Sequence, residues 1–367
     1  MPRIRRTALS LALAAVTPAL AVLPSAASAQ AAPASSASSV SSASSGGASS
    51  GVRCQEVRVP VAMTEGGTAD QTIAGSLCTP RKGRATTVQV MVPGGNYDRR
   101  YWTMAPDSRT PSYEESMQRA GYATLVLDRL GTGSSSRPVS TRYTGDTHSE
   151  SVHQVLKQLN AGKIAHQRFP RVVLVGHSMG SGTSAKVAIK HPEDMDALVL
   201  TGTASQQGSE GSSGLVETGI HPANQDPRWA GAGLDDGYII TKPGERVKWF
   251  YYEKTMDPAT LAADEAAAQP DAMPSPALFP KKEDFRRIKV PTLVVLGDHD
   301  KIVCGGAGGS DCSSTAALQA QENRNFSKAA HVKAVVIKDT GHSINQQLTA
   351  PALYTAVKVW ERHAQHR

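Results

Sequence analysis

The sequence predicts an α/β fold built on a mostly parallel sheet, preceded by an antiparallel hairpin and interrupted by an inserted cap. Three observations predict this fold class. Apolar runs rich in Val, Leu and Ile alternate with helical segments, and two strand-like runs meet at a Gly-Gly turn. Residues 203–290 also separate two strand-like runs, which is far more chain than an ordinary crossover needs.

The N-terminal residues 1–29 have the order of a secretory signal peptide. Three arginines within residues 3–6 precede an apolar stretch from Ala8 to Val16, and small residues lead to Ala27-Ser28-Ala29. The apolar stretch is too short to anchor the chain in a bilayer. We therefore expect a secreted protein, cleaved after Ala29, and the arginine pair leaves open whether export uses the general or the twin-arginine route.

Residues 30–51 are almost wholly Ala, Ser, Gly and Pro, a composition that predicts a disordered linker before a domain at 52–367. The formal net charge is +7, but no basic run is interleaved with aromatic residues, so nucleic acid is excluded as a partner. No later stretch is apolar for long enough to cross a membrane, and no stable membrane insertion is expected.

The four cysteines predict two disulfides. Cys54 and Cys78 flank the runs "CQEVRVPVAM" and "QTIAGSLC", and a hairpin folded at their midpoint, Gly66, sets the two cysteines opposite each other. Cys304 and Cys312 bracket the loop "CGGAGGSDC", where an exported chain is expected to form a second bridge. Neither pair has the C-x-x-C spacing or a histidine at ligand distance, so no metal site is expected.

After the hairpin, strands and helices alternate as in right-handed crossovers of a parallel sheet. Strands are predicted at 86–92, 122–128, 171–176, 196–202, 291–297 and 331–339, and helices at 112–120, 147–162, 181–190, 314–330 and 355–365.

The insertion, at about 205–285, is predicted to form a cap over the sheet. It begins with the flexible stretch "SQQGSEGSSG" and contains Trp249, Phe250, Tyr251 and Tyr252. We expect these aromatic side chains to pack within the cap, and direct contact with a substrate is the alternative.

The stretch "RVVLVGHSMGSGTSAK" (171–186) sets a serine between a buried strand and a helix. Gly176 and Gly180 flank Ser178 in the pattern G-x-S-x-G, which in this context presents the hydroxyl on a sharp, strained turn. The helix that follows points free N–H groups at the same spot and favours negative charge there. Ser178 is therefore the candidate nucleophile; in the alternative, the glycines only let a strand turn into a helix.

A serine nucleophile needs a base, and the base needs an orienting acid. Such groups gather beyond the carboxyl ends of parallel strands. Of the eleven histidines, His342 and His299 have the right position, and His299 lies beside the acid candidates. His342, which follows the strand at 331–339, is the predicted base.

The acid is predicted to be Asp300, which lies just beyond the strand at 291–297. A carboxylate directly at a strand end, as at Asp298, more often caps the turn, whereas one two residues further on can swing back towards the base. Asp298 is the alternative and Asp339 a third candidate.

Two N–H groups must hold the oxyanion of a tetrahedral intermediate. The residue after the nucleophile, Met179, supplies one. The second is expected from the loop "VPGGNYD" (92–98) after the first parallel strand, where Gly95 is the first choice and Asn96 the next.

These stretches resemble the α/β-hydrolase superfamily, in its cap-bearing branch of esterases, lipases and haloperoxidase-like hydrolases. "GHSMGSGTSAKVAIKHP" is similar to the family's elbow and helix, and "DRLGTGSS" (128–135) to its D-x-x-G-x-G-x-S loop. "IKVPTLVVLGDHDKIV" (288–303) resembles its acid-bearing strand, whose G-x-x-D spacing selects Asp300, and "DTGHS" (339–343) resembles its histidine loop. The chain departs from the family where Pro93-Gly94 replaces the frequent His-Gly, which bears on the second oxyanion donor.

The sequence thus predicts a serine hydrolase with no cofactor, acting on small-molecule esters with an apolar or aromatic acyl group. His342 takes the Ser178 proton, Asp300 orients the imidazole, and water releases the acyl group. An amidase or peptidase, a lactonase or an acyltransferase with the same triad is the alternative, because the cap selects the leaving group and the acceptor. A non-catalytic secreted binding protein on the same fold is a further alternative.

Overall fold

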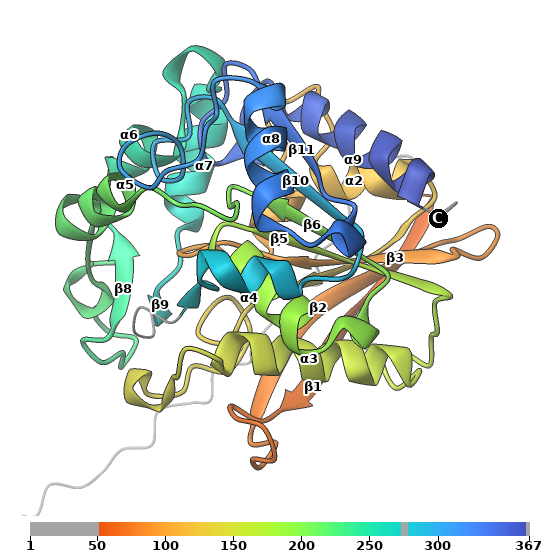
Figure 1. Ribbon diagram of the computed structural model, residues 1–367. Helices are drawn as coiled ribbons and strands as arrows, with labels where there is room; N and C mark the ends of the chain where they lie inside the picture. The colour runs from red at the N-terminus through yellow and green to blue at the C-terminus, as the bar shows by residue number, and fades with distance from the viewer. Residues whose placement is uncertain (1–50, 273–277, 365–367) are drawn as a thin grey trace, which may run out of the picture. The chain divides into compact units, whose positions relative to one another are not determined.

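The computed structural model describes residues 51–272 and 278–364, so the predicted signal peptide, and all of the predicted linker except Gly51, lie outside the described residues. In this part of the chain, eight strands form one sheet in the order β1-β2-β4-β3-β5-β6-β10-β11 (Figure 1). The strands are β1 Val52–Val61, β2 Gln71–Pro80, β3 Thr87–Val92, β4 Ala123–Leu127, β5 Arg171–His177, β6 Ala197–Thr201, β10 Thr292–Gly297 and β11 Lys333–Ile337.

The six strands that pair in parallel confirm the predicted strands, with ends that differ by one or two residues. Every residue of β3, β4, β6 and β10 is buried. Hydrophobic clusters cover both faces of the sheet, which explains why these strands are continuous apolar runs instead of alternating ones. Because the strands are parallel, the loops after β3, β5, β6, β10 and β11 all leave the same edge of the sheet.

The N-terminal hairpin extends the sheet in the antiparallel sense. Cys54 of β1 lies opposite Cys78 of β2, and a disulfide joins them. The register places the turn at Gly66, as the spacing of the cysteines predicts. β2 then pairs antiparallel with β4, with Cys78 opposite Thr124, so the hairpin is continuous with the parallel strands.

Helices fill the crossovers, and no helix among the described residues is long and apolar enough to span a membrane. The helices of the sheet layers are α1 Arg100–Thr103, α2 Tyr113–Arg119, α3 Thr147–Asn160, α4 Met179–Lys190, α8 Thr315–Asn325 and α9 Ala350–Ala364. α1 is not among the predicted helices, and two others differ from the prediction by several residues at one end. α8 ends at Asn325 and the chain continues in a separate 3-10 turn, η8 Lys328–Ala330. α9 begins at Ala350, because Pro351 is tolerated in a first helical turn.

The segment between β6 and β10, predicted to be a cap, has its own three-stranded antiparallel sheet in the order β7-β8-β9 (Figure 1). Its regular elements are α5 Ser209–Gly214, β7 Ile220–Pro222, β8 Tyr238–Thr241, α6 Glu245–Phe250, α7 Pro258–Ala267 and β9 Asp271–Ala272, followed by the 3-10 helix η7 Lys282–Arg287. The segment also contains the short helical turns η3 Leu215–Gly219, η4 Ala223–Gln225 and η5 Glu253–Thr255. Outside it are the short turns η1 Ser140–Arg142, η2 Pro192–Asp194 and η9 Ile344–Gln346.

The aromatic side chains of this segment pack partly within it and partly against residues outside it: Trp249 hydrogen-bonds to Glu245 within the segment, whereas the ring of Phe250 lies 5.8 Å from that of His342. Phe250 and Tyr251 are buried, and the Tyr251 hydroxyl donates to Asp264 Oδ2 at 2.9 Å. Tyr252 stacks on the ring of His299, with ring centroids 3.7 Å apart.

Glu361 of α9 makes stability depend on pH. The side chain is buried and accepts a hydrogen bond from Gln89 Nε2 at 2.5 Å, and burial raises the pKa of Glu361 from 4.5 to about 7. The folded state therefore keeps a proton that the unfolded chain releases, so the stability from this group is present below pH 4.5 and is lost as the pH rises to 7. We expect Glu361→Gln to make the fall in unfolding free energy between pH 5 and pH 8 about 2 kcal/mol smaller. Urea unfolding at the two pH values measures this. The exposed Glu115→Gln is the control, and an equal fall in both variants contradicts the prediction.

Candidate active site

Ser178 lies on the turn between β5 and α4 with φ 51° and ψ −118°, a conformation that is strained for any residue with a side chain. β6 and the residues after it hold this turn. The Ser178 N–H donates to the Thr201 carbonyl at 2.8 Å, and the Thr203 hydroxyl donates to the Ser178 carbonyl at 3.1 Å. The side chain is half-buried, so the hydroxyl is accessible at the edge of the sheet.

The two glycines that flank Ser178 are required by close packing. A Cβ at Gly176 would lie 2.5 Å from the Cα of Ser181, and a Cβ at Gly180 would meet the backbone carbonyls of Val92 and Pro93. No side chain fits at either position while α4 starts this close to the ends of β3 and β5. The pattern G-x-S-x-G thus follows from the turn itself, and the turn presents the serine.

His342 and Asp300 are paired. His342 Nδ1 lies 2.8 Å from Asp300 Oδ2, and both side chains are buried. The other carboxylate oxygen of Asp300 accepts the N–H groups of Ile302 and Val303 at 3.0 and 3.1 Å, which fixes the carboxylate in place. Because Asp300 occupies Nδ1, Nε2 is the ring nitrogen left to face a nucleophile.

The competing acids and the competing base are engaged elsewhere. Asp298 accepts the Thr340 N–H at 3.2 Å and forms an ion pair with Lys338, so it caps the neighbouring loop. Asp339 is exposed, and its carbonyl accepts a hydrogen bond from the Thr255 hydroxyl. The His299 side chain is 43% exposed and lies against Tyr252 rather than in the site.

His177, the residue before Ser178, is a packed neighbour. Its ring stacks on Tyr101 with centroids 4.1 Å apart, and its Nδ1 lies 3.2 Å from the Thr201 hydroxyl. Burial lowers the pKa of His177 well below its usual value, and the nearby His342 lowers it further. The ring, 4.9 Å from that of His342, is therefore neutral and adds no positive charge beside the base.

Gly202 lets His342 approach the turn between β5 and α4 that carries Ser178. It has φ 60°, and a Cβ there would lie 2.8 Å from His177 Cε1 and 3.1 Å from His342 Cε1. The next residue, Thr203, contacts the Ser178 carbonyl. Among the described residues the Ser178 hydroxyl makes no hydrogen bond, so its contact with His342 stays a prediction; in unliganded enzymes such contacts are often long and tighten when substrate binds.

The loop after β3 approaches the serine. A Cβ at Gly94 would lie 3.2 Å from the Cβ of Ser178. The Asn96 N–H already donates to Asp271 Oδ2 at 3.1 Å, whereas the Gly95 N–H has no partner in the part of the chain described. Met179 is the first residue of α4, and a first-turn N–H has no partner within its helix.

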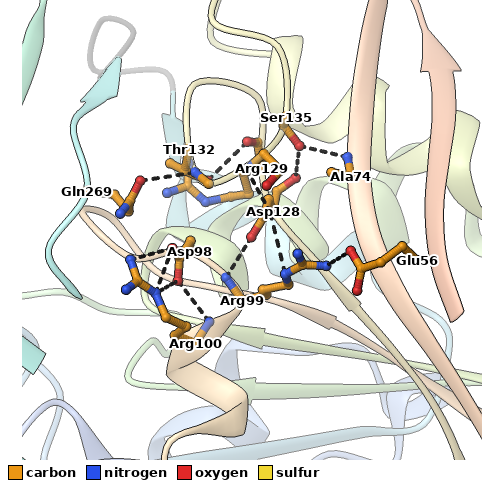
Figure 2. Close-up of polar contacts among 12 residues, drawn as sticks. Glu56, Ala74, Asp98, Arg99, Arg100, Asp128, Arg129, Thr132, Ser135 and Gln269 are labelled. Carbon is orange, nitrogen blue, oxygen red and sulfur yellow. Dashed lines mark hydrogen bonds and ion pairs between the residues drawn. The ribbon is translucent and has the colours of Figure 1, made fainter. Parts of the chain in front are cut away.

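In the loop after β4, which resembles the family's D-x-x-G-x-G-x-S loop, Asp128 has a structural role. Figure 2 shows its carboxylate between several loops; it accepts the N–H groups of Arg99 and Ser134, each at 2.9 Å. Gly133 has φ 52°, and a Cβ there would collide with the Asp128 carboxylate. Arg129, which follows Asp128, also contacts the loop after β3, and the sequence did not predict a role for it. Its only signal in the sequence is that a charged residue stands two positions after the buried strand β4, and its partners lie far away in sequence.

The second disulfide lies just after the acid. Cys304 is bonded to Cys312, and the Cys304 N–H donates to the Asp300 carbonyl at 3.0 Å. Because backbone N–H groups and His342 already hold the Asp300 carboxylate, the bridge is expected to stabilise the loop and not the triad. Cys304→Ser/Cys312→Ser should lose about 2 to 3 kcal/mol of stability with kcat retained. Thermal unfolding and ester kinetics test this. A fall in kcat without loss of stability would instead give the bridge a role in aligning the acid.

Comparisons with known proteins agree with this architecture. The profile of the alpha/beta hydrolase family matches residues 89–356. A 2-hydroxy-6-oxo-6-(2'-aminophenyl)hexa-2,4-dienoic acid hydrolase from Metapseudomonas resinovorans is 31% identical over 190 residues, which are 50% of this chain and 59% of that protein. Lipase 1 of Psychrobacter immobilis is 26% identical over 200 residues, which are 51% of this chain and 56% of that protein. The chain thus spans less than two thirds of the length of either relative.

Solved structures show the same fold. A thermophilic esterase from Thermogutta terrifontis superposes with a TM-score of 0.56 at 18% identity, covering 84% of this chain and 99% of that one. The enol-lactonase from Burkholderia xenovorans gives a TM-score of 0.55 at 18% identity, covering 83% of this chain and all of that one, 100%. The predicted fold, with its mostly parallel sheet and antiparallel N-terminal hairpin, is confirmed. With the family profile matched across Ser178, Asp300 and His342, the chain belongs to the alpha/beta hydrolase family.

Proposed function

We propose that the protein is a secreted serine hydrolase that cleaves carboxylic esters through an acyl-enzyme intermediate. His342 Nε2 accepts the Ser178 proton as the hydroxyl oxygen attacks the ester carbonyl. The protonated His342 then gives this proton to the departing alkoxide. Water, deprotonated by the same ring, attacks the acyl-serine and releases the acid.

The observation that carries this proposal is the buried hydrogen bond between Asp300 and His342 beside a strained serine turn. With Nδ1 held at 2.8 Å by a carboxylate, the imidazole has one tautomer and one orientation, and the imidazolium formed during attack is stabilised. If Ser178 only packed beside the Asp300–His342 pair, its strained backbone at φ 51° would serve no purpose. A catalytic role accounts for this strain.

Met179 and Gly95 are the proposed oxyanion donors. The start of α4 supports Met179, because its N–H points out of the helix beside Ser178. The engagement of the Asn96 N–H with Asp271 supports Gly95 over Asn96.

The substrate class is proposed to be small esters with an apolar or aromatic acyl group. The relative named as a lipase supports an ester substrate, and the relative named as the hydrolase of an aminophenyl-substituted dienoic acid supports an aromatic acyl group. Phe250 supports the apolar acyl group, because its ring centroid lies 5.8 Å from that of His342. Secretion is supported by the two disulfides, which persist in oxidising compartments.

A fluorophosphonate probe tests the proposal. We expect the purified protein to be labelled on Ser178 and Ser178→Ala to stay unlabelled, with peptide mass spectrometry locating the adduct. Kinetics on matched p-nitrophenyl esters and amino-acid anilides then separate an esterase from an amidase. An unlabelled wild type overturns the serine mechanism, and faster cleavage of anilides overturns the ester assignment.

A further inference from the structure

The loop after β3, residues 93–98, carries the proposed donor Gly95 and is called the oxyanion loop here. Arg129 lies behind this loop and donates to two of its carbonyls. Its Nε lies 2.9 Å from the Pro93 oxygen, and its Nη2 lies 2.7 Å from the Gly94 oxygen. The side chain is 1% exposed and forms a buried ion pair with Asp271 of β9, which is 0% exposed. Two neighbouring carbonyls are thus turned toward one buried guanidinium.

This arrangement sets the direction of the Gly95 N–H. The Gly94 carbonyl and the Gly95 N–H belong to one planar trans peptide, so they point in opposite directions. With the carbonyl held by Arg129, the N–H is turned away from the guanidinium. The next N–H, that of Asn96, points back and donates to Asp271 at 3.1 Å. The two N–H groups therefore face opposite sides, and only that of Gly95 has no partner among the described residues.

We propose that Arg129, held by Asp271, is the positioning residue that orients the Gly95 N–H as an oxyanion donor. This inference rests on the proposed hydrolase function. Rotation of the Gly94–Gly95 peptide breaks a charge-assisted hydrogen bond in a buried setting, where such bonds are strong. The donor is thereby fixed before substrate arrives, which is what stabilisation of a developing negative charge requires.

Asp271 extends this control to the segment between β6 and β10. Figure 2 shows Gln269 beside the loop after β4 that carries Arg129, and the Gly133 N–H of this loop donates to Gln269 Oε1 at 3.2 Å. Asn96 Nδ2 donates to the carbonyls of Ile239 and Gln269 at 2.8 and 3.0 Å, and the Gln269 N–H donates to the Asn96 carbonyl at 3.1 Å. Asn96 therefore connects the oxyanion loop to β8 and β9. The position of the segment between β6 and β10 and the orientation of the Gly95 N–H are coupled through these bonds.

The main test variant is Arg129→Met/Asp271→Asn. It removes both buried charges together, which avoids stranding one of them, and keeps an oxygen acceptor for the Asn96 N–H. We expect kcat for p-nitrophenyl butyrate to fall about 100-fold with KM little changed, because the donor acts in the transition state. The affinity for a trifluoromethyl ketone, whose adduct carries an oxyanion, should fall by the same factor. Arg129→Lys, which keeps the charge on a single donor nitrogen, should recover part of both losses.

The matched control is Arg228→Met/Asp226→Asn. Asp226 is also buried and pairs with Arg228 at 2.7 Å, but neither contacts the oxyanion loop. Hydrogen exchange of peptides covering residues 94–97 adds a readout that needs no activity; exchange should rise in the Arg129 variants and stay unchanged in the control.

Equal kcat and equal ketone affinity in the test and control variants overturn the proposal. If the double variant does not fold, Arg129→Lys decides by the same comparison. If the wild type neither turns over esters nor binds the ketone, the proposed function fails, and the exchange measurement decides the positioning role alone. In that case, unchanged exchange at residues 94–97 in Arg129→Met/Asp271→Asn overturns the proposed control of the Gly95 N–H by Arg129.

Discussion

Ser178→Ala is expected to lower kcat for ester hydrolysis by about 10⁶-fold, because no other group in the site can form the acyl-enzyme. The residual rate should come from binding and the oxyanion donors alone. Steady-state hydrolysis of p-nitrophenyl esters measures the loss, and a pre-steady-state burst in the wild type reports acylation directly.

The control for this variant lies within α4, the helix that follows Ser178. Ser184 is buried and donates to the Gly180 carbonyl at 2.7 Å, without contact to the proposed base. Ser184→Ala should keep the wild-type kcat. Activity that survives Ser178→Ala while the probe still labels the protein would move the nucleophile elsewhere.

Asp300→Asn is expected to lower kcat by about 10⁴-fold, because an amide that donates to Nδ1 selects the wrong imidazole tautomer. The amide is nearly the same size as the carboxylate, so thermal unfolding should change much less than the rate. Asp298→Asn is the matched control, since Asp298 follows the same strand but binds the Thr340 N–H and Lys338. A larger loss of activity in Asp298→Asn than in Asp300→Asn would exchange their proposed roles.

The parts of the fold that the sequence predicts are those with a strong local signal. β5 and β10 are continuous apolar runs that end at His177 and Gly297. Such runs are typical of parallel strands that are buried on both faces, so the sequence predicts them clearly. The hairpin follows equally from two cysteines spaced symmetrically about Gly66. Ser178, Asp300 and His342 could be proposed as a triad because each lies within a few residues of the carboxyl end of such a run.

The parts that the sequence does not predict depend on distant partners. β7, β8 and β9 have two to four residues each, too few to show a period, and they exist only because they pair with each other. α1 is a four-residue helix whose Tyr101 and Trp102 are buried by tertiary packing. Arg129 and Asp271 are 142 residues apart, and neither position has a neighbour in sequence that points to the other.

The chain order of the sheet governs when the site becomes reactive. The elbow is complete once β5, α4 and β6 are in place, but the carboxylate and the imidazole follow β10 and β11, the last strands of the sheet. A nascent polypeptide that stops short of Ile337 therefore carries an exposed hydroxyl with nothing to take its proton. Under the proposed mechanism, ester cleavage begins only when the final strand docks, so premature truncation is expected to yield an inert protein instead of an unregulated one.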